Sequence, residues 1–259
     1  MTRPKVLLTN DDGIRAEGIF AMWKALSAWA DVTVVAPETH QSATGHGVTL
    51  AEPLMVAPVT TVGGMTGTAV DGRPADCTKL ALVELCPDVD LVVSGINMGA
   101  NAGINVFYSG TVAAAIEAAF LGKPAIAVSK LLRRDVPDDY DAAAAICLDV
   151  IQKLWTSNAV HAGEVVNVNV PALKPGQQHS GIRVVPQCVK PLMDAFEERQ
   201  SPRGQSYYWN TGVFSLEGGE AGTDVAGLRD DAVVVTPLHL NLTAVDRMQR
   251  TADAMAAAT

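Results

Sequence analysis

The 259-residue sequence has little basic charge and few aromatic residues. Its 19 lysines and arginines stand against 28 aspartates and glutamates, and aromatic residues make up only 5%. The resulting formal net charge of −9 does not suit a protein that grips duplex nucleic acid, because that task requires clustered lysine and arginine. A phosphate-bearing ligand must therefore be held locally, by a metal ion, a helix N-terminus or backbone amides.

Long hydrophobic runs are also missing. No apolar stretch approaches the roughly 20 residues of a membrane-spanning helix, since Glu117 and Lys123 interrupt the best candidate. No leader-like segment precedes the first expected strand. The cysteines lack CxxC spacing and lie in apolar surroundings, at Cys77, Cys86, Cys147 and Cys188. We therefore expect a cytoplasmic protein with no membrane partner and with buried, reduced thiols.

A dinucleotide-binding fingerprint is absent as well. No G-x-G-x-x-G follows the first expected strand, which ends in Asn10-Asp11-Asp12-Gly13. Two carboxylates at that point would repel a pyrophosphate, so a Rossmann dehydrogenase is disfavoured.

What is present is an alternation of apolar strands and amphipathic helices. Apolar residues make up 48% of the chain, enough for a sizeable core. The pattern predicts an α/β fold, a Rossmann-like doubly wound and mostly parallel sheet. The expected strands are Lys5 to Thr9, Val32 to Ala36, Leu91 to Val93, Pro124 to Ser129, Val165 to Val170 and Val233 to Leu238. The expected helices follow Gly13, span Ala75 to Leu85, open at Ser109-Gly110-Thr111, and span Asp139 to Trp155 and Thr243 to Ala258.

The C-terminal third differs in texture from the rest. We expect a single domain over residues 1–259, with a core over 1–175 and with an arm, the final strand and a terminal helix over 176–259. The arm is rich in proline, glycine and charge, with β-prone patches at Arg183 to Val189 and Tyr207 to Leu216. It is too thin to hold a core of its own, so it should pack against another subunit or cover a site. A second β-prone region, residues 53–70, predicts a hairpin or lid around Gly63-Gly64.

Polar side chains gather where several of these strands end. Asp11 and Asp12 follow the first strand, and Asn97 and Asn101 follow Leu91 to Val93. Ligands of open α/β sheets bind beyond the carboxyl ends of the strands. The helix start at Ser109-Gly110-Thr111 offers free N–H groups to an anion. These features indicate a phosphate site beside a hard metal ion.

Each of these features also has a plain structural interpretation. Asn10 to Gly13 would form a solvated Asx turn in any protein, and Thr111 would serve as an ordinary helix N-cap. The loop after the second strand adds Ser42, a possible metal or phosphate ligand, and His40 and His46. These histidines are either acid–base groups or simply solvated.

Taken together, the motifs resemble the SurE family of metal-dependent 5′-nucleotidases over almost the whole chain. The resemblance is carried by Leu7-Leu8-Thr9-Asn10-Asp11-Asp12-Gly13, Val35-Ala36-Pro37, Gln41-Ser42, Ser94-Gly95-Ile96-Asn97-Met98-Gly99-Ala100-Asn101, Tyr108-Ser109-Gly110-Thr111-Val112-Ala113-Ala114-Ala115, Gly222-Thr223-Asp224 and Thr236-Pro237-Leu238. Two departures from the family pattern stand out: Asp231-Ala232 replaces a common glycine and aromatic, and the loop Gly99 to Gly103 carries small residues.

The resemblance implies one divalent metal ion per subunit. The implied metal ligands are Asp11, Asp12, Ser42 and Asn97, and the implied phosphate-binding residues are Asn101, Ser109, Gly110 and Thr111. It further implies a nucleotide substrate and a homodimer or homotetramer that exchanges its C-terminal arm and tail. An all-oxygen ligand set suits Mg²⁺ or Mn²⁺ better than zinc.

The expected reaction is hydrolysis of a nucleoside monophosphate by direct attack of water, with Asp11 as the orienting or base group. Two carboxylates about 4 Å from a phosphate charge cost roughly 4 kcal/mol each at an effective dielectric of about 20, and a divalent cation reverses that sign. An aspartyl-phosphate intermediate is the mechanistic rival, but phosphatases of that type use Asp-x-Asp. The functional alternative is a nucleotide-binding scaffold with a structural metal. The base, the choice of 5′- or 3′-phosphate, and activity on polyphosphate stay open.

Overall fold

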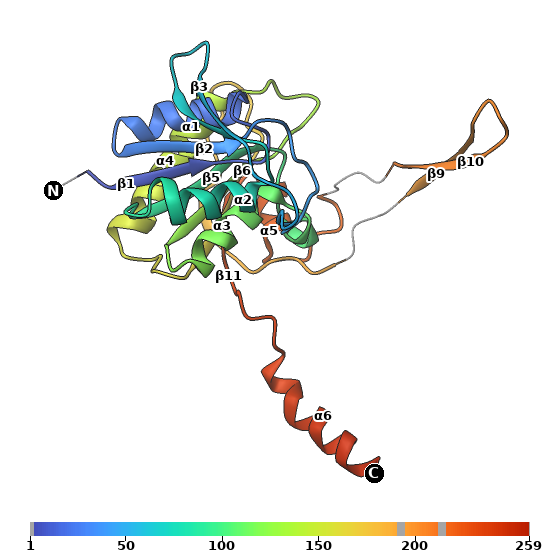
Figure 1. Cartoon of the computed structure of the whole chain (residues 1–259). Helices are drawn as coiled ribbons and strands as arrows, with labels where there is room; N and C mark the ends of the chain where they lie inside the picture. The colour runs from blue at the N-terminus through green and yellow to red at the C-terminus, as the bar shows by residue number, and fades with distance from the viewer. Residues whose placement is uncertain (1–2, 191–194, 212–215, 259) are drawn as a thin grey trace.

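The computed structural model describes residues 3–190, 195–211 and 216–258 (Figure 1). Its centre is a nine-stranded sheet in the order β3-β4-β2-β1-β5-β6-β7-β11-β8. The strands β4, β2, β1, β5, β6 and β7 run parallel to one another, while β3 and β11 are antiparallel to their neighbours β4 and β7. The predicted fold class, a doubly wound and mostly parallel sheet, is confirmed.

The elements lie close to the expected ranges. The strands are β1 (Lys5–Thr9), β2 (Asp31–Pro37), β3 (Val56–Thr60), β4 (Thr66–Val70), β5 (Leu91–Met98), β6 (Ala125–Lys130), β7 (Val165–Val170), β8 (Ile182–Val184), β9 (Phe196–Gln200), β10 (Ser206–Asn210) and β11 (Val233–Leu238). The helices are α1 (Glu17–Ser27), α2 (Pro74–Leu80), α3 (Gly110–Phe120), α4 (Tyr140–Thr156), α5 (Asp224–Arg229) and α6 (Val245–Ala257). A π-helical turn (Ala81–Leu85) prolongs α2, and a 3₁₀ turn (Gly103–Phe107) precedes α3.

Helices cover the sheet in two layers because successive strand residues point to opposite faces. Val6 and Leu8 pack on the face covered by α1 and α4, and Leu7 packs on the face covered by α2 and α3. The α3 layer is rich in alanine, so α3 lies close against the sheet. Four free cysteines are buried, and burial raises the pKa of the thiols of Cys77, Cys86 and Cys147, as expected for inert core residues.

The strand order reverses at β1, which sets the location of the site. From β1 the chain continues to β2 on one side, whereas β5 lies on the other side and leads to β6 and β7. The carboxyl ends of β1 and β5 therefore flank a topological switch point, where ligands of such sheets bind.

Several details differ from the sequence prediction. β5 extends to Met98, five residues beyond the expected Val93, so Asn97 belongs to a strand. The expected hairpin is confirmed as β3–β4, which joins the edge of the main sheet. Of the two β-prone patches in the arm, one yields only the three residues of β8 and the other yields β10; residues 212–215 lie outside the described residues. The short helix α5 and the strand β9 had no clear sequence signal.

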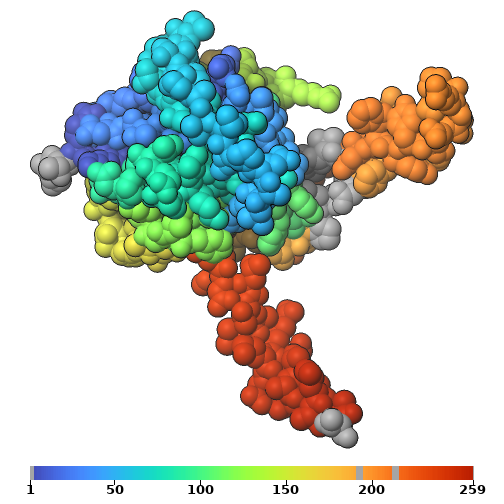
Figure 2. All heavy atoms as spheres, in the orientation of Figure 1, coloured from blue at the N-terminus to red at the C-terminus, as the bar shows by residue number. Residues whose placement is uncertain are grey.

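Two segments project away from the domain. The β9–β10 hairpin forms its own two-stranded sheet, and α6 extends from another side of the molecule at the end of the described chain (Figures 1 and 2). Every residue of α6 is exposed. In the described part of the chain no helix is long and apolar enough to span a membrane.

Candidate active site

The turn after β1 presents two carboxylates at the switch point. The Asn10 side chain closes this turn, since its Nδ2 donates to the Gly13 carbonyl at 3.0 Å and its Oδ1 accepts from the Gly13 N–H at 3.2 Å. Gly13 has a φ of +99°, a value that suits glycine. Asn10 is fully buried and Asp11 is 5% exposed. The Asx turn is therefore formed, but the interpretation of it as a solvated surface turn is wrong.

Asp11 is held from the opposite side by the start of α3. The Thr111 hydroxyl donates to Asp11 Oδ1. A Cβ on Gly110 would lie 2.8 Å from the Asp11 Cβ, so only glycine permits this approach. Burial, together with the neighbouring charge of Asp12, raises the pKa of Asp11 to about 6, against the lowering effect of the Thr111 hydroxyl. The carboxyl group is thus disfavoured as an anion, and a nearby cation would favour its ionised form.

Asp12 points to the other side of the turn. Its Oδ2 accepts a 2.9 Å hydrogen bond from the Met98 N–H at the end of β5, and its Oδ1 lies 3.3 Å from His40 Nδ1. Burial raises the pKa of Asp12, while the Met98 N–H and His40 oppose that rise. The two adjacent carboxylates therefore have different partners, Thr111 at the start of α3 for Asp11 and Met98 and His40 for Asp12.

Ser42 is linked to Asp12 through the ring of His40. The Ser42 hydroxyl is hydrogen-bonded to His40 Nε2, and the other ring nitrogen of His40 contacts Asp12. The loop is attached to the first turn by the Gln41 N–H, which donates to the Asp11 carbonyl at 2.8 Å. Of the two histidines considered from the sequence, His40 lies at the site. His46 does not, and contacts Glu117 on α3 instead.

Asn97 and Asn101 come from the end of β5 and the loop that follows. Asn97 Nδ2 donates to the Gly99 carbonyl at 2.7 Å, and Oδ1 of Asn97 accepts no hydrogen bond from the described residues. Asn101 is 8% exposed. Its backbone N–H donates to Asn169 Oδ1 at 2.8 Å, and its side-chain Nδ2 donates to Ser129 Oγ at 2.9 Å.

The N-terminus of α3 completes the arrangement. Ser109 is the N-cap, because its Oγ accepts from the Val112 N–H at 3.1 Å. The alternative interpretation of Thr111 as the N-cap is wrong, since its hydroxyl is committed to Asp11. Ser109, Gly110 and Thr111 are all buried, and the helix end faces the carboxylates.

The donor set fits a hard divalent cation. Asp11 and Asp12 supply carboxylates, Ser42 a hydroxyl and Asn97 an amide oxygen that is free to accept. The raised pKa values of both aspartates mark a place where negative charge lacks compensation. Among the described residues no three His, Cys, Asp or Glu side chains converge as they would at a zinc centre.

A pocket of about 300 Å³ adjoins the site on its α1 and α4 side. Its walls include Asp12, His40, Met98, Asp138 and Tyr140. Burial and the nearby carboxylates raise the pKa of Tyr140 to about 12, so its hydroxyl stays protonated. The pocket places a donor and several acceptors beside the carboxylates.

The chain matches a known protein family. The family model "Survival protein SurE" matches residues 6–193, which is well over half of the chain. The chain belongs to the SurE family. Among SurE proteins with curated names, the 5′-nucleotidase SurE of Syntrophobacter fumaroxidans is 44% identical over 92% of this chain and 94% of its own length. That of Rhodopirellula baltica is 43% identical over 96% and 98%, respectively.

A solved SurE structure agrees with this fold. The crystal structure of the SurE protein from Aquifex aeolicus aligns with a TM-score of 0.82 and 35% identity, and covers 95% of this chain and 98% of that one. The family resemblance inferred from the sequence motifs is confirmed.

The sequence did not reveal the roles of three buried side chains, Asn167, Asn169 and Asp224, that hold the loop after β5 in place. Asn167 and Asn169 lie on the same face of β7, and both donate to the Asn101 carbonyl, at 2.8 and 3.2 Å. Two asparagines in an otherwise apolar strand were the available signal. Asp224 is fully buried and accepts from the N–H groups of Gly103 and Cys188, each at 2.8 Å. Asp224 thereby connects the 3₁₀ turn before α3, through Gly103, to the first part of the arm, through Cys188.

Proposed function

We propose that this chain is a metal-dependent 5′-nucleotidase, which hydrolyses nucleoside 5′-monophosphates to a nucleoside and phosphate. The 5′-nucleotidase activity is supported by membership of the SurE family, in which relatives 41–44% identical carry that name. The geometry of the site supports the proposed metal ion, site residues and mechanism.

The observation that carries the proposal is the convergence at the switch point. Asp11 contacts the N-terminus of α3, and Asp12 contacts Met98, the residue after Asn97 at the end of β5, although these groups come from separate segments. A phosphomonoester needs a group that neutralises its two negative charges and donors for its remaining oxygens. We propose that Asp11, Asp12, Ser42 and Asn97 hold one Mg²⁺ or Mn²⁺ per subunit, and that Asn101, Ser109, Gly110 and Thr111 bind the phosphate.

The bound metal ion would polarise the phosphoryl oxygen and acidify a water molecule. The protein's own groups supply the remaining steps. Asp11 is buried and held from the side of α3, and we propose that it orients the attacking water and accepts its proton. Thr111 keeps Asp11 in one orientation through its hydroxyl. The α3 N-terminus stabilises negative charge that grows on the equatorial oxygens.

The test is phosphate release from a panel of nucleoside 5′- and 3′-monophosphates and short polyphosphate, with Mg²⁺, Mn²⁺ or chelator. We expect release to need metal, and Asp11→Asn to lower kcat by roughly 10²–10⁴-fold. Asp246→Asn, which alters an aspartate with an 82% exposed side chain on α6, is the control and should keep wild-type activity. Release that persists in chelator would contradict the metal dependence.

The alternative is a nucleotide-binding scaffold with a structural metal. It predicts Mn²⁺ and nucleotide binding without phosphate release under any condition in the panel.

We further propose that the protein is cytoplasmic and forms a homodimer or homotetramer. The exposed apolar residues of β9–β10 and α6 support the assembly.

A further inference from the structure

Glu117 is a buried carboxylate that the proposed mechanism does not use. It lies in the middle of α3 and its side chain is only 7% exposed. Its Oε2 is 2.8 Å from His46 Nε2, and its Oε1 is 3.0 Å from Lys79 Nζ. Burying an ionised carboxylate is costly unless it is paired. The two partners come from different segments, since Lys79 belongs to α2 and His46 to the loop after β2.

That loop is the one that carries Ser42. From Glu38 to Val48 the chain has no helix or strand, so the position of Ser42 depends on a few anchors. On one flank the Gln41 N–H donates to the Asp11 carbonyl. On the other flank the Gly45 N–H donates to the Tyr108 carbonyl at 3.1 Å, and the His46 side chain binds Glu117. Ser42 lies in the short segment between the anchors at Gln41 and Gly45.

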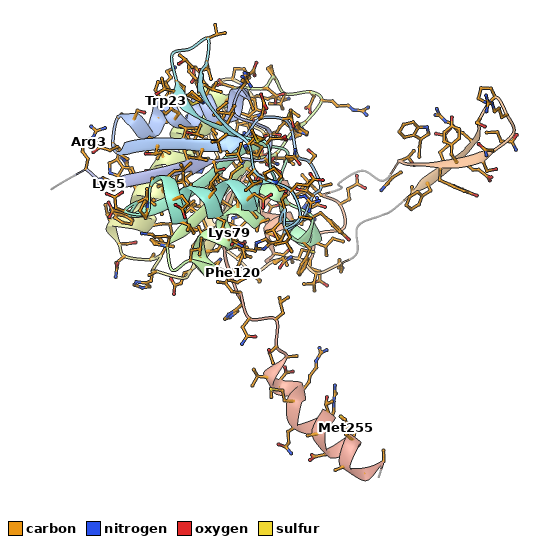
Figure 3. The ribbon with its side chains drawn as sticks, in the orientation of Figure 1. Arg3, Lys5, Trp23, Lys79, Phe120 and Met255 are labelled. Carbon is orange, nitrogen blue, oxygen red and sulfur yellow. The ribbon has the colours of Figure 1, made fainter. Side chains whose placement is uncertain are left out.

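The His46 ring is fixed on two sides. Besides its hydrogen bond to Glu117, it stacks on Phe120, with ring centroids 5.6 Å apart and planes at 12°. Phe120 and Lys79 lie on the same side of the domain (Figure 3). Both contacts of the ring are therefore made with α3, because Phe120 is the last residue of that helix.

We infer that Glu117, acting through His46, is a positioning residue for Ser42. This inference rests on the proposed function, because it gives Ser42 the role of metal ligand. α3 then sets both sides of the site: Thr111 holds Asp11 at the helix N-terminus, and Glu117 holds the Ser42 loop about two turns further along. Partners of metal ligands typically change metal affinity by about 10–100-fold when removed.

Lys79 provides a matched control. It binds the same carboxylate from α2, a segment separate from the loop that carries Ser42. If Glu117 acts only as a buried charge, loss of either partner should have the same effect. If it acts by placing the loop, only the His46 contact should matter.

The experiment compares wild type, His46→Leu, His46→Gln and Lys79→Met, each prepared metal-free. Mn²⁺ affinity is measured by calorimetry, and loop mobility by hydrogen exchange of residues 41–47. Leucine can still pack on Phe120 but cannot donate, whereas the glutamine amide can donate to Glu117. We expect His46→Leu to weaken Mn²⁺ binding by roughly 10–100-fold and to speed exchange in the loop. His46→Gln should recover most of the affinity, and Lys79→Met should stay within about threefold of wild type.

The outcomes separate this inference from the proposed function. If wild type binds no Mn²⁺, the proposed function fails and the inference fails with it. If wild type binds and His46→Leu binds equally well, the inference alone is overturned. Equal losses in His46→Leu and Lys79→Met would also overturn it, because Glu117 would then act through charge balance. Should His46→Leu not fold, a folded His46→Gln variant that binds Mn²⁺ at least tenfold more weakly than wild type would overturn the inference.

Discussion

The carboxyl edge of the sheet and the projecting C-terminal segments differ in how they treat their side chains. At the sheet edge polar groups are buried, with Asp11 5% and Thr111 0% exposed, and these two side chains are hydrogen-bonded to each other. In the hairpin and in α6 apolar groups are exposed: Phe196 is 64%, Trp209 56% and Met248 58% exposed. Each region thus reverses the usual distribution of polar and apolar residues.

The difference indicates two kinds of function. Buried, paired polar groups on rigid elements hold a reaction geometry in advance, which costs stability in the free protein. Exposed apolar groups on segments without a core are typical of surfaces that pack against another chain. On α6 the residues Val245, Met248 and Met255 recur at helical spacing on one face. We therefore expect substitutions at the sheet edge to change ligand binding, and substitutions in the projecting segments to change the oligomeric state.

The largest expected effect concerns the pH dependence of stability at the sheet edge. In the folded metal-free protein the pKa of Asp11 is about 6, above its ordinary value of 3.8. The folded state therefore keeps a proton that the unfolded state loses as pH rises from about 4 to 6. Stability should fall across that window, by about 3 kcal/mol, and stay low above it.

Asp11→Asn removes this cost because its side chain does not ionise. In chelator, the variant should unfold at a higher temperature than wild type at pH 7.5, and the difference should shrink toward pH 4. Added Mn²⁺ should stabilise wild type only. Thermal unfolding at both pH values measures this, and a difference that does not change with pH would contradict the raised pKa.

A smaller effect is expected where α3 meets Asp11. In Gly110→Ala the new Cβ would lie 2.8 Å from the Asp11 Cβ and 3.0 Å from Oδ2. The helix start or Asp11 must shift, and such displacements should lower kcat/KM by roughly 10–100-fold. Gly218→Ala is the control, since a Cβ added there would have no neighbouring atom within 4 Å among the described residues. Wild-type kcat/KM in Gly110→Ala would show that close approach of α3 to Asp11 is not required.

The smallest effect on the site should come from α6. Met248→Asp places a charge on the apolar face of this helix, and we expect a lower molecular mass in analytical ultracentrifugation. Mn²⁺ affinity per subunit should be unchanged, because α6 projects away from the site within the described part of the chain (Figure 1). Gln249→Asp, on a neighbouring face, should keep the wild-type mass. An unchanged mass in Met248→Asp would argue against α6 as an interface.

Much of the fold was predictable because its signals are local. Lys5–Thr9 and Val165–Val170 have the same bounds in prediction and structure, since each is an apolar run ended by turn residues or proline. Asn97 was predicted at the right edge but in a loop, because Gly95 and Asn97 do not look like strand residues. α5 was missed, since six residues are too few for a periodic pattern to emerge.

The site, like the fold, was predictable from the sequence only in part. The sequence alone placed carboxylates and amides at the ends of these strands. It did not identify the partners of those groups, because these lie far along the chain. Asp11 and Thr111 are separated by 100 residues, Asn101 and Asn169 by 68, and His46 and Glu117 by 71.

By itself, then, the sequence determined the α/β class, the buried strands and the polar composition of one sheet edge, because hydrophobic period and turn chemistry act between near neighbours. Only the tertiary structure decided that β1 and β5 are adjacent, that Gly110 gives α3 access to Asp11, and that Glu117 receives His46. Those contacts depend on strand order and helix packing, which arise when distant segments share one core.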